Sequence, residues 1–467
     1  MDLWDHQKAA ISKALPYEGY LLAHDMGTGK TCTAINIINK IGAKCVLIMS
    51  PKSVVSVWTP EFRKFSETEF ITVPLDTGGV KKKEATVREQ ITISNQLRKP
   101  IAVIVNYESA WRPPLGPSYE IQKGRNVMID PGTLMRIPWD LVICDESHRI
   151  KGVGSKISWF CARLGKKVPR RLGLTGTPTP NDLLDLYAQF RFLDPRIFGT
   201  SFARFKKRYA VLGGFNNKQT LGFQNVPELN RKFYSITDFV KADEVQDLPE
   251  TMHIQRSCKL APKGRRVYDA LEKDFVAEVE GKLISVDIAL VKFLRLAQLA
   301  GGYAQLDDQE RGEVIDNSKI ETLADICEDL PFEEPIVVFC RFRNEIKRIK
   351  DVLSALGRST AELSGSKNQL EEWKQGKFNS LVTQIQAGSL GVDMTRSRYC
   401  IFFSKDYNLG VYEQALKRTH RPGQTRRVVY YHVTAQNTAD QVIYQALRKK
   451  KNVITHFLEM YRKRKAV

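Results

Sequence analysis

One short segment, placed between an apolar run and an amphipathic run, constrains this chain more than any other feature. Residues 20–23 form the apolar run and predict a short buried strand, while residues 31–41 carry isoleucines at helical spacing. In a strand–loop–helix unit, glycines let backbone N–H groups approach phosphates, and the helix N-terminus adds partial positive charge. We therefore predict a phosphate-binding loop made of His24, Asp25, Met26, Gly27, Thr28, Gly29, Lys30 and Thr31.

Two side chains of this loop are expected to contact the nucleotide and its metal ion. Lys30 is expected to reach the β- and γ-phosphates, and the Thr31 hydroxyl is expected to bind magnesium. The strict form of the loop has glycine at the first position, where this chain has His24. Because a Gly-x-Gly-Lys-Thr string also arises by chance, the loop needs support from a second motif.

A pair of carboxylates after a second apolar run supplies that support. Residues 141–144 predict a strand that delivers Asp145 to the magnesium and Glu146 to a water molecule, which Glu146 can orient and deprotonate. An Asp-Glu pair alone is usually part of a solvated surface. The two motifs together, each after an apolar strand, predict hydrolysis of ATP or GTP with Mg²⁺.

The net charge of the chain indicates the kind of partner that it binds. The 467 residues carry a formal net charge of +20, which favours a polyanionic partner. The composition favours nucleic acid, DNA or RNA, although a merely basic protein is the alternative.

Eight cysteines without a Cys-x-x-Cys pair indicate a reducing interior without disulfides or structural zinc. We expect no membrane contact, since no apolar run approaches the roughly 20 residues of a membrane helix and the N-terminus lacks a secretory pattern.

The order of apolar and amphipathic runs predicts an α/β fold with two parallel-sheet lobes joined by a helical region. The predicted domains are 1–200, a helical insertion over 201–330, and 331–467. Within the first lobe, residues 112–138 are rich in Pro and Gly and predict a surface loop. The expected strands are 20–23, 45–49, 101–105, 141–144 and 172–174, then 336–340, 381–383, 399–403 and 428–433.

A basic segment of the second lobe is a candidate for completing the nucleotide site. A helix there would place Gln414, Arg418 and Arg421 on one face. Arginine donors aimed at the γ-phosphate neutralise charge that develops during transfer. We therefore expect the ATP site to lie in the cleft between the lobes; a solvated basic helix is the alternative.

With these motifs in place, the chain resembles the superfamily-two helicases and translocases, and specifically the Snf-type (sucrose-nonfermenting) remodelling ATPases. The resemblance implies two RecA-like lobes and covers nearly the whole chain. The Thr-Gly-Thr-Pro-x-x-Asn string and the His-Arg-x-Gly-Gln ending are specific to this branch. The matching segments are Gln7, 24–31, 47–52, 145–151, 174–181, 387–393 and 414–424.

The resemblance also implies roles that the residues alone do not. Gln7 would read the adenine edge and so favour ATP, unless it is simply a polar residue of an N-terminal helix. His148, Thr175, Gly176 and Thr177 would couple hydrolysis to movement of the lobes. Contacts with the nucleic-acid backbone would come from Ser50, Pro51, Lys52, Tyr107, Gly388 and Ser389, although Tyr107 could equally be a core aromatic.

These observations predict a DNA-dependent ATPase that translocates on double-stranded DNA, acting in DNA remodelling, replication or repair. One alternative is a helicase that separates strands or drives branch migration on forked DNA or RNA. A second is a non-catalytic nucleic-acid-binding scaffold, which the presence of Lys30, Glu146 and Arg421 disfavours. Because no targeting module is recognisable, we expect a minimal bacterial or phage-like form. We expect it to act as a monomer in the cytoplasm rather than in a nucleus.

Overall fold

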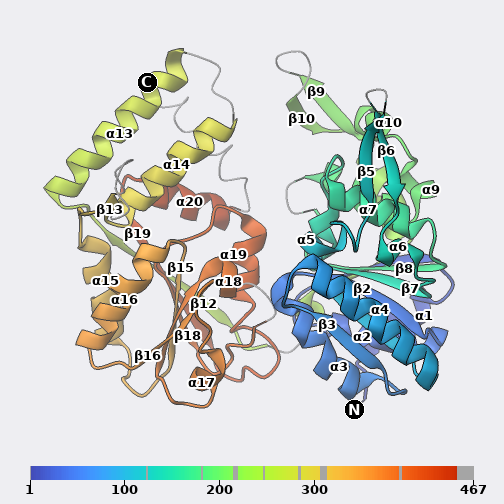
Figure 1. Cartoon of the computed structure of the whole chain (residues 1–467). Helices are drawn as coiled ribbons and strands as arrows, with labels where there is room; N and C mark the ends of the chain where they lie inside the picture. The colour runs from blue at the N-terminus through green and yellow to red at the C-terminus, as the bar shows by residue number, and fades with distance from the viewer. Residues whose placement is uncertain are drawn as a thin grey trace. The chain divides into compact units, whose positions relative to one another are not determined.

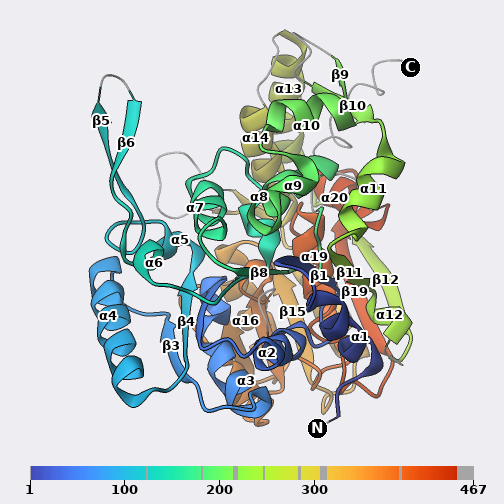
Figure 2. The same cartoon turned by 90° about the vertical axis from the view of Figure 1, so that its right-hand side faces the viewer.

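The chain folds as two compact units, Met1–Gln246 and Asp247–Val467, which Figures 1 and 2 show in two views. The structure is a computed structural model that describes residues 2–122, 125–179, 182–213, 219–245, 248–281, 286–304, 313–388 and 392–449. The middle segment expected over 201–330 is divided between the two units. Its first part, through α11 (Val226–Tyr234) and β11 (Thr237–Val240), belongs to the first unit.

The first unit is built on a seven-stranded sheet in the order β11-β1-β8-β7-β2-β4-β3. Every pair of neighbouring strands runs parallel, as expected for a RecA-like lobe. The five predicted strands of this unit are confirmed. The bounds are β1 (Gly19–His24), β2 (Cys45–Ser50), β3 (Ile71–Leu75), β4 (Ile101–Asn106), β7 (Leu141–Asp145) and β8 (Arg170–Leu174).

Helices and short 3-10 turns connect these strands. They are α1 (Asp5–Ala14), α2 (Lys30–Ile41), η1 (Lys52–Val57), α3 (Trp58–Phe65), α4 (Val80–Leu97), α5 (Tyr107–Ala110), η2 (Ser147–Ile150), α7 (Lys156–Gly165), η3 (Leu183–Asp185), α8 (Leu186–Leu193), α9 (Pro195–Phe198), α10 (Phe202–Tyr209) and α12 (Ala242–Val245). A short hairpin of β9 (Ala210–Gly213) and β10 (Gln219–Phe223) follows α10.

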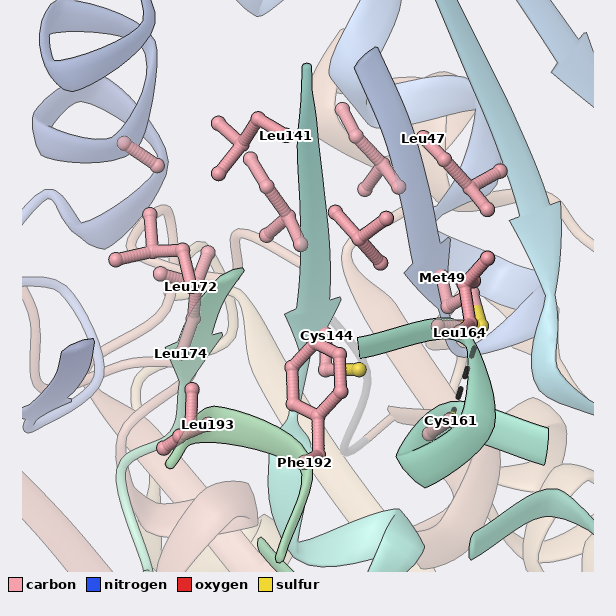
Figure 3. Close-up of a cluster of buried hydrophobic side chains, with 14 of the residues drawn as sticks. Leu47, Met49, Leu141, Cys144, Cys161, Leu164, Leu172, Leu174, Phe192 and Leu193 are labelled. Atoms are coloured by element: carbon pink, nitrogen blue, oxygen red, sulfur yellow. Dashed lines mark hydrogen bonds between the residues drawn. The ribbon is translucent and has the colours of Figure 1, made fainter. Parts of the chain in front are cut away.

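A close-packed cluster beside the sheet fixes the ends of the strands that carry the candidate site. Figure 3 shows leucines of β2, β7 and β8 together with Cys161 and Leu164 of α7 and Phe192 and Leu193 of α8. The Cys161 Sγ lies 3.9 Å from the Met49 Sδ. All of these side chains are buried. Because such cores tolerate little change in volume, the carboxyl end of β7 is held rigidly.

The region 112–138 contains regular structure, so the prediction of a surface loop is wrong there. The strands β5 (Ser118–Gln122) and β6 (Arg125–Asp130) pair as an antiparallel hairpin, and α6 (Thr133–Arg136) follows. Figure 2 shows this hairpin extending away from the sheet of its unit. The flanking Pro and Gly residues masked a run of alternating side chains that favours a strand.

The second unit is built on a six-stranded parallel sheet in the order β12-β19-β18-β15-β17-β16. The four predicted strands are confirmed. The bounds are β12 (Thr251–Cys258), β15 (Ile336–Cys340), β16 (Thr360–Leu363), β17 (Ser380–Gln384), β18 (Tyr399–Phe402) and β19 (Val428–Ala435). The helices are α13 (Pro262–Gly281), α14 (Val286–Ala300), α15 (Ser318–Asp329), α16 (Arg343–Ala355), α17 (Leu370–Lys374), α18 (Ile385–Gly388), α19 (Leu409–Leu416) and α20 (Ala439–Arg448), and β13 (Tyr303–Ala304) pairs with β14 (Glu313–Val314).

Both faces of this second sheet are covered. Along β15, Val337 and Phe339 point into one hydrophobic cluster, and Val338 and Cys340 point into another. A parallel strand that is buried on both faces is apolar throughout, which is why the sequence of β15 was readable as a strand. Among the helices in the described ranges, none combines the length and the apolar character needed to cross a membrane.

Candidate nucleotide site

The predicted phosphate loop lies where the sequence placed it, between β1, which ends at His24, and α2, which begins at Lys30. Two glycines give the loop its shape, with φ of 86° at Gly27 and 80° at Gly29. Side chains other than glycine rarely adopt this region of φ. A Cβ on Gly29 would also lie 2.1 Å from the Gln7 Nε2. The loop therefore requires glycine at both positions.

The ammonium group of Lys30 is held over its own loop. Its Nζ donates hydrogen bonds to the carbonyl oxygens of His24, at 2.8 Å, and Asp25, at 3.0 Å. The Thr28 hydroxyl also donates to the Asp25 carbonyl, at 2.7 Å. Thr31 follows Lys30 in the first turn of α2 and is partly exposed. A cation and a hydroxyl are thus brought together at the helix N-terminus, where the helix dipole favours an anion.

Gln7 reaches the same loop from α1. Its Nε2 donates to the Thr28 carbonyl at 3.2 Å, and its Oε1 accepts from the Trp4 backbone N–H at 3.0 Å. The side chain of Gln7 is buried. The structure therefore places Gln7 against the phosphate loop, and recognition of adenine by Gln7 stays a prediction.

His24 has a buried partner that sequence reasoning missed. The His24 ring is fully buried, and its Nε2 lies 2.8 Å from Oδ2 of Asp238, on the adjacent strand β11. Lys13 of α1 donates to the other carboxylate oxygen at 2.7 Å. Burial lowers the pKa of His24. Burial opposes ionisation of Asp238, but hydrogen bonds from His24 and Lys13 hold the pKa of its carboxyl below the usual value. This contact fixes the start of the phosphate loop to a neighbouring strand.

Substitution of Asp238 by alanine should destabilise the first unit. The buried His24 would lose its hydrogen-bond partner at Nε2, and leaving a buried polar group unpaired costs about 1–3 kcal/mol. We expect the free energy of unfolding in urea to fall by that amount. Asp238→Asn is the matched control, because an amide oxygen can still accept from His24 and should retain most of the stability. Equal stability of the alanine variant and the native chain would contradict this role.

The acidic pair sits at the carboxyl end of β7, as predicted. Asp145 accepts a hydrogen bond at Oδ2 from Trp58 Nε1, at 3.2 Å, and its backbone carbonyl accepts from the Tyr107 hydroxyl, at 2.7 Å. Burial, and then the charge of Glu146, raise the pKa of the Asp145 carboxyl. Glu146 follows in a left-handed conformation with φ of 54°. This uncommon backbone geometry directly follows the end of the extended strand at Asp145.

Glu146 is linked to the predicted coupling residues by a chain of short contacts. Its Oε2 lies 3.4 Å from the His148 Nδ1, and that nitrogen lies 3.1 Å from the Thr175 hydroxyl. The Thr177 backbone N–H donates to the same hydroxyl at 3.1 Å. A Cβ on Gly176 would lie 3.5 Å from the His24 carbonyl, so Gly176 adjoins the phosphate loop. The structure thus brings the predicted coupling residues together around the acidic pair.

The oxygen donors of this site fit a magnesium ion. Thr31 supplies a hydroxyl and Asp145 a carboxylate, and Mg²⁺ prefers oxygen ligands of these kinds. In the described part of the chain, the buried Oε2 of Glu146 has no hydrogen-bond donor. Burial and the charge of Glu146 raise the pKa of the Asp145 carboxyl, and a cation bound beside these oxygens would offset both effects.

The predicted nucleic-acid contacts of the first unit differ in their accessibility. Lys52 is exposed, whereas Ser50 and Pro51 are buried. Tyr107 is only 3% exposed and donates its hydroxyl to the Asp145 carbonyl. This burial favours the alternative role of Tyr107 as a core aromatic, and its contact with nucleic acid stays a prediction. In the second unit, Gly388 is the last residue of α18, and Ser389 lies outside the described residues.

The basic segment of the second unit is less helical than predicted. The helix α19 ends at Leu416, so Gln414 lies in the helix while Arg418 and Arg421 lie beyond its end. The expected single helical face is therefore wrong. The Arg418 carbonyl accepts from the Met394 N–H of a neighbouring loop at 3.0 Å. Pro422 disfavours a helical conformation at the residue before it, and Gly423 has φ of 101°.

Both arginines nonetheless lie against one neighbouring loop. Arg421 donates from Nη1 to the Val392 carbonyl at 3.4 Å, and its Nε is buried without a hydrogen-bond partner in the described ranges. Arg418 is 3% exposed. Gln424 holds the same loop by donating to the Thr395 and Ser397 carbonyls, each at 3.1 Å. The segment after α19 is thus fixed to residues 392–397.

A phosphate loop and an acidic pair, each following a strand of one parallel sheet, define an ATP-hydrolysing enzyme. Residues 10–300 match the family model described as SNF2-related domain, and residues 318–423 match the helicase conserved C-terminal domain. The chain belongs to the SNF2-related family. This membership confirms the resemblance drawn from the motifs.

Individual relatives differ greatly in length. The chain is 25% identical to protein p41 of Acyrthosiphon pisum secondary endosymbiont phage 1, over 94% of each chain. It is 24% identical to the DNA repair and recombination protein RAD54-like of Drosophila yakuba, covering 95% of this chain and 60% of the relative. With protein CHROMATIN REMODELING 5 of Arabidopsis thaliana it shares 25% identity but spans only 26% of that relative. Among solved structures, it is similar to the Sulfolobus solfataricus SWI2/SNF2 ATPase core in complex with dsDNA, with 24% identity, a TM-score of 0.44, and 98% and 93% of the two chains covered.

Proposed function

We propose that this protein is a DNA-dependent ATPase that uses ATP hydrolysis to translocate on double-stranded DNA, in remodelling, replication or repair. The observation that carries the proposal is the connected site of the first unit. The phosphate loop and the acidic pair lie there on one sheet of an SNF2-related chain. The contact between the His148 Nδ1 and the Thr175 hydroxyl, 3.1 Å apart, lies on the same sheet. Through such contacts, binding or hydrolysis of the nucleotide can change the conformation of the rest of the sheet.

In this proposal the chain's own residues perform the hydrolysis. The backbone of 25–29 and the Lys30 ammonium bind the phosphates of ATP, and Glu146 orients the attacking water and accepts its proton. Thr31 and Asp145 would hold Mg²⁺, which would supply compensating positive charge to the phosphate oxygens. His148 keeps the Glu146 carboxylate oriented, since its Nδ1 lies 3.4 Å from the Glu146 Oε2.

We further propose that Arg418 and Arg421 of the second unit contact the γ-phosphate when ATP is bound, with Gln414 supporting them. An arginine in this role stabilises charge that develops on the transferred phosphoryl group. The buried Nε of Arg421, unbonded in the described residues, is a donor that an anion can satisfy. Hydrolysis would then remove the phosphate group that these arginines contact.

The net charge of +20 supports nucleic acid as the track. Lys52 and the backbone around Ser50, Pro51 and Gly388 are the proposed phosphate contacts. Such contacts provide affinity without sequence information, so we expect little sequence preference. The relatives named for DNA repair and recombination and for chromatin remodelling favour DNA over RNA.

The first test is the ATPase rate with no nucleic acid, single-stranded DNA, duplex DNA, forked DNA and RNA in parallel. Strong stimulation by plain duplex is the expected result. Release of a labelled strand from a fork would instead identify a strand-separating helicase, and displacement of a third strand from a triplex would identify translocation without unwinding. Absence of stimulation by any nucleic acid would overturn the proposed partner.

Replacement of Lys30 by alanine should weaken ATP binding by about tenfold or more, because one charge-assisted contact with the phosphates is lost. The affinity for a fluorescent ATP analogue is the measurement. Lys40→Ala is the matched control, because Lys40 is an exposed residue of the same helix, ten positions from Lys30. Equal affinity of the Lys30 variant and the native protein would remove Lys30 from the site.

A further inference from the structure

A second cavity of the first unit lies apart from the nucleotide site, at the root of the β5–β6 hairpin. Its volume is about 590 Å³, within the range of about 300–1,000 Å³ that is typical of ligand sites. The aromatic side chains that line it are Trp111, Tyr119, Trp159 and the buried Phe160. They come from the segment after α5, from β5 and from α7. None of the residues assigned above to ATP or magnesium lines this cavity.

Two of these aromatic rings are unusually open to solvent. Trp159 is 48% exposed and Tyr119 is 42% exposed. Their exposure leaves a large apolar area in water, which a bound planar group could cover. Pro113 and Pro117 form part of the wall, and their rings restrict the backbone there. The cavity therefore offers preformed aromatic surfaces.

Three of these rings, those of Trp111, Tyr119 and Trp159, each have a cation beside them. The Lys156 Nζ lies 5.1 Å from the centroid of the Trp111 ring, and the Arg163 guanidinium lies 5.5 Å from the centroid of the Tyr119 ring. The Arg191 guanidinium lies 4.2 Å from the centroid of the Trp159 ring. Lys156 and Arg163 are themselves lining residues, and the described lining contains no carboxylate. The electrostatic field in the cavity therefore favours an anionic ligand.

Aromatic planes combined with cations match the chemistry of a nucleotide. Proteins bind unpaired nucleotides by stacking bases on aromatic side chains and pairing the phosphates with Lys and Arg. A base within a continuous duplex is stacked and paired, so it cannot enter a cavity of this kind without being extruded. A proline-rich peptide also docks on aromatic residues, but such a peptide makes no necessary use of Lys156 and Arg163.

We propose that this cavity binds an unpaired nucleotide of a DNA strand, with the base stacked on Trp159 and its phosphates paired with Lys156 and Arg163. The site gives the protein a preference for DNA that contains a gap, a flap or a fork. The inference rests on the proposed function only in taking DNA as the partner. It requires neither ATP nor contact between the two units.

The test measures binding of a labelled single-stranded oligonucleotide, and of its duplex, by fluorescence anisotropy without ATP. For Trp159→Ala we expect the ratio of single-strand affinity to duplex affinity to fall about fivefold or more, as for one lost base stack. Trp159→Phe keeps a stacking surface and should restore most of that ratio. An unchanged ratio in the alanine variant would overturn the proposal.

A second pair of variants avoids the packing of Trp159 against Arg191. Arg163→Ala should weaken single-strand binding and reduce the slope of log affinity against log salt by about 0.7, the value for one lost phosphate contact. Lys166→Ala is the matched control, an exposed cation at the end of the same helix that does not line the cavity. Identical behaviour of the two variants would count against the site.

The remaining outcomes separate this inference from the proposed function. Normal stimulation of the ATPase by duplex, together with unchanged single-strand binding in both variants, would overturn only the nucleotide cavity. If duplex DNA does not stimulate the ATPase of the native protein, while single-strand binding depends on Trp159, only the proposal of a translocase is overturned. Binding of a proline-rich peptide that the oligonucleotide does not displace would identify the cavity as a protein-docking site and reject the proposal.

Discussion

Replacement of Glu146 by glutamine is expected to lower the rate of ATP turnover by about 10²–10⁴-fold, the usual contribution of a general base. Glutamine matches the size of glutamate but cannot accept the proton of the attacking water. The phosphate loop and Lys30 are unchanged in this variant, so ATP affinity should stay within about threefold of the native value. Steady-state turnover and equilibrium binding of a labelled ATP analogue measure the two quantities separately.

The matched control for Glu146→Gln is Glu108→Gln. Glu108 is a glutamate of the same unit whose side chain is 54% exposed, and its carboxylate lies 3.7 Å from Arg149. The substitution changes the same chemical group but leaves the acidic pair intact, so turnover should be close to native. Normal turnover in the Glu146 variant would show that another group activates the water. Loss of both turnover and ATP binding would indicate that Glu146 instead holds the site together.

The parts of the site that could be predicted from the sequence are those encoded within a few consecutive residues. The phosphate loop lies between β1 (Gly19–His24) and α2 (Lys30–Ile41), and each of the two flanking elements has its own hydrophobic pattern. The acidic pair follows β7 in the same way. Because parallel strands place their carboxyl ends at one edge of the sheet, short-range patterns were enough to bring these residues together.

Contacts between distant segments could not be predicted in this way. The buried pair of His24 and Asp238 joins residues 214 positions apart, and no spacing rule links them. Tyr107 was left with two possible roles, and only the fold shows that Trp58 and Tyr107 both contact Asp145, through its side chain and its carbonyl respectively. Residues 237–240 fell within the expected helical insertion, so Asp238 was not recognised as an acidic residue of a buried strand that requires a partner.

The end of α19 shows a different reason for failure. The sequence from Gln414 to Arg421 has helical spacing of its polar residues, yet the helix ends at Leu416. The Arg418 carbonyl has no helical donor, because residue 422 is a proline without an N–H, and it accepts from the Met394 N–H of a neighbouring loop instead. The rigid ring of Pro422 also disfavours continuation. Here the contact with a neighbouring loop outweighs the local preference for a helix.

Because α19 ends before Arg421, substitution of Arg421 is the more direct test of whether the second unit takes part in ATP hydrolysis. Its guanidinium is anchored by one hydrogen bond, 3.4 Å from Nη1 to the Val392 carbonyl, while its buried Nε lacks a partner in the described residues. An arginine that completes a phosphoryl-transfer site contributes about 10³–10⁵-fold to the rate. We expect Arg421→Ala to lower DNA-stimulated ATP turnover by a factor in that range, while DNA affinity is retained.

Arg426→Ala is the matched control for this variant, because Arg426 lies five residues further on and pairs at the surface with Glu334, at 2.8 Å. A surface ion pair contributes little, so turnover should remain near native. Arg421→Lys should recover only part of the rate, since lysine keeps the charge but not the planar fork of donors. Native turnover in Arg421→Ala with DNA present would mean that the second unit does not supply this arginine to the nucleotide. An equal loss in both variants would point to a general effect of removing positive charge instead.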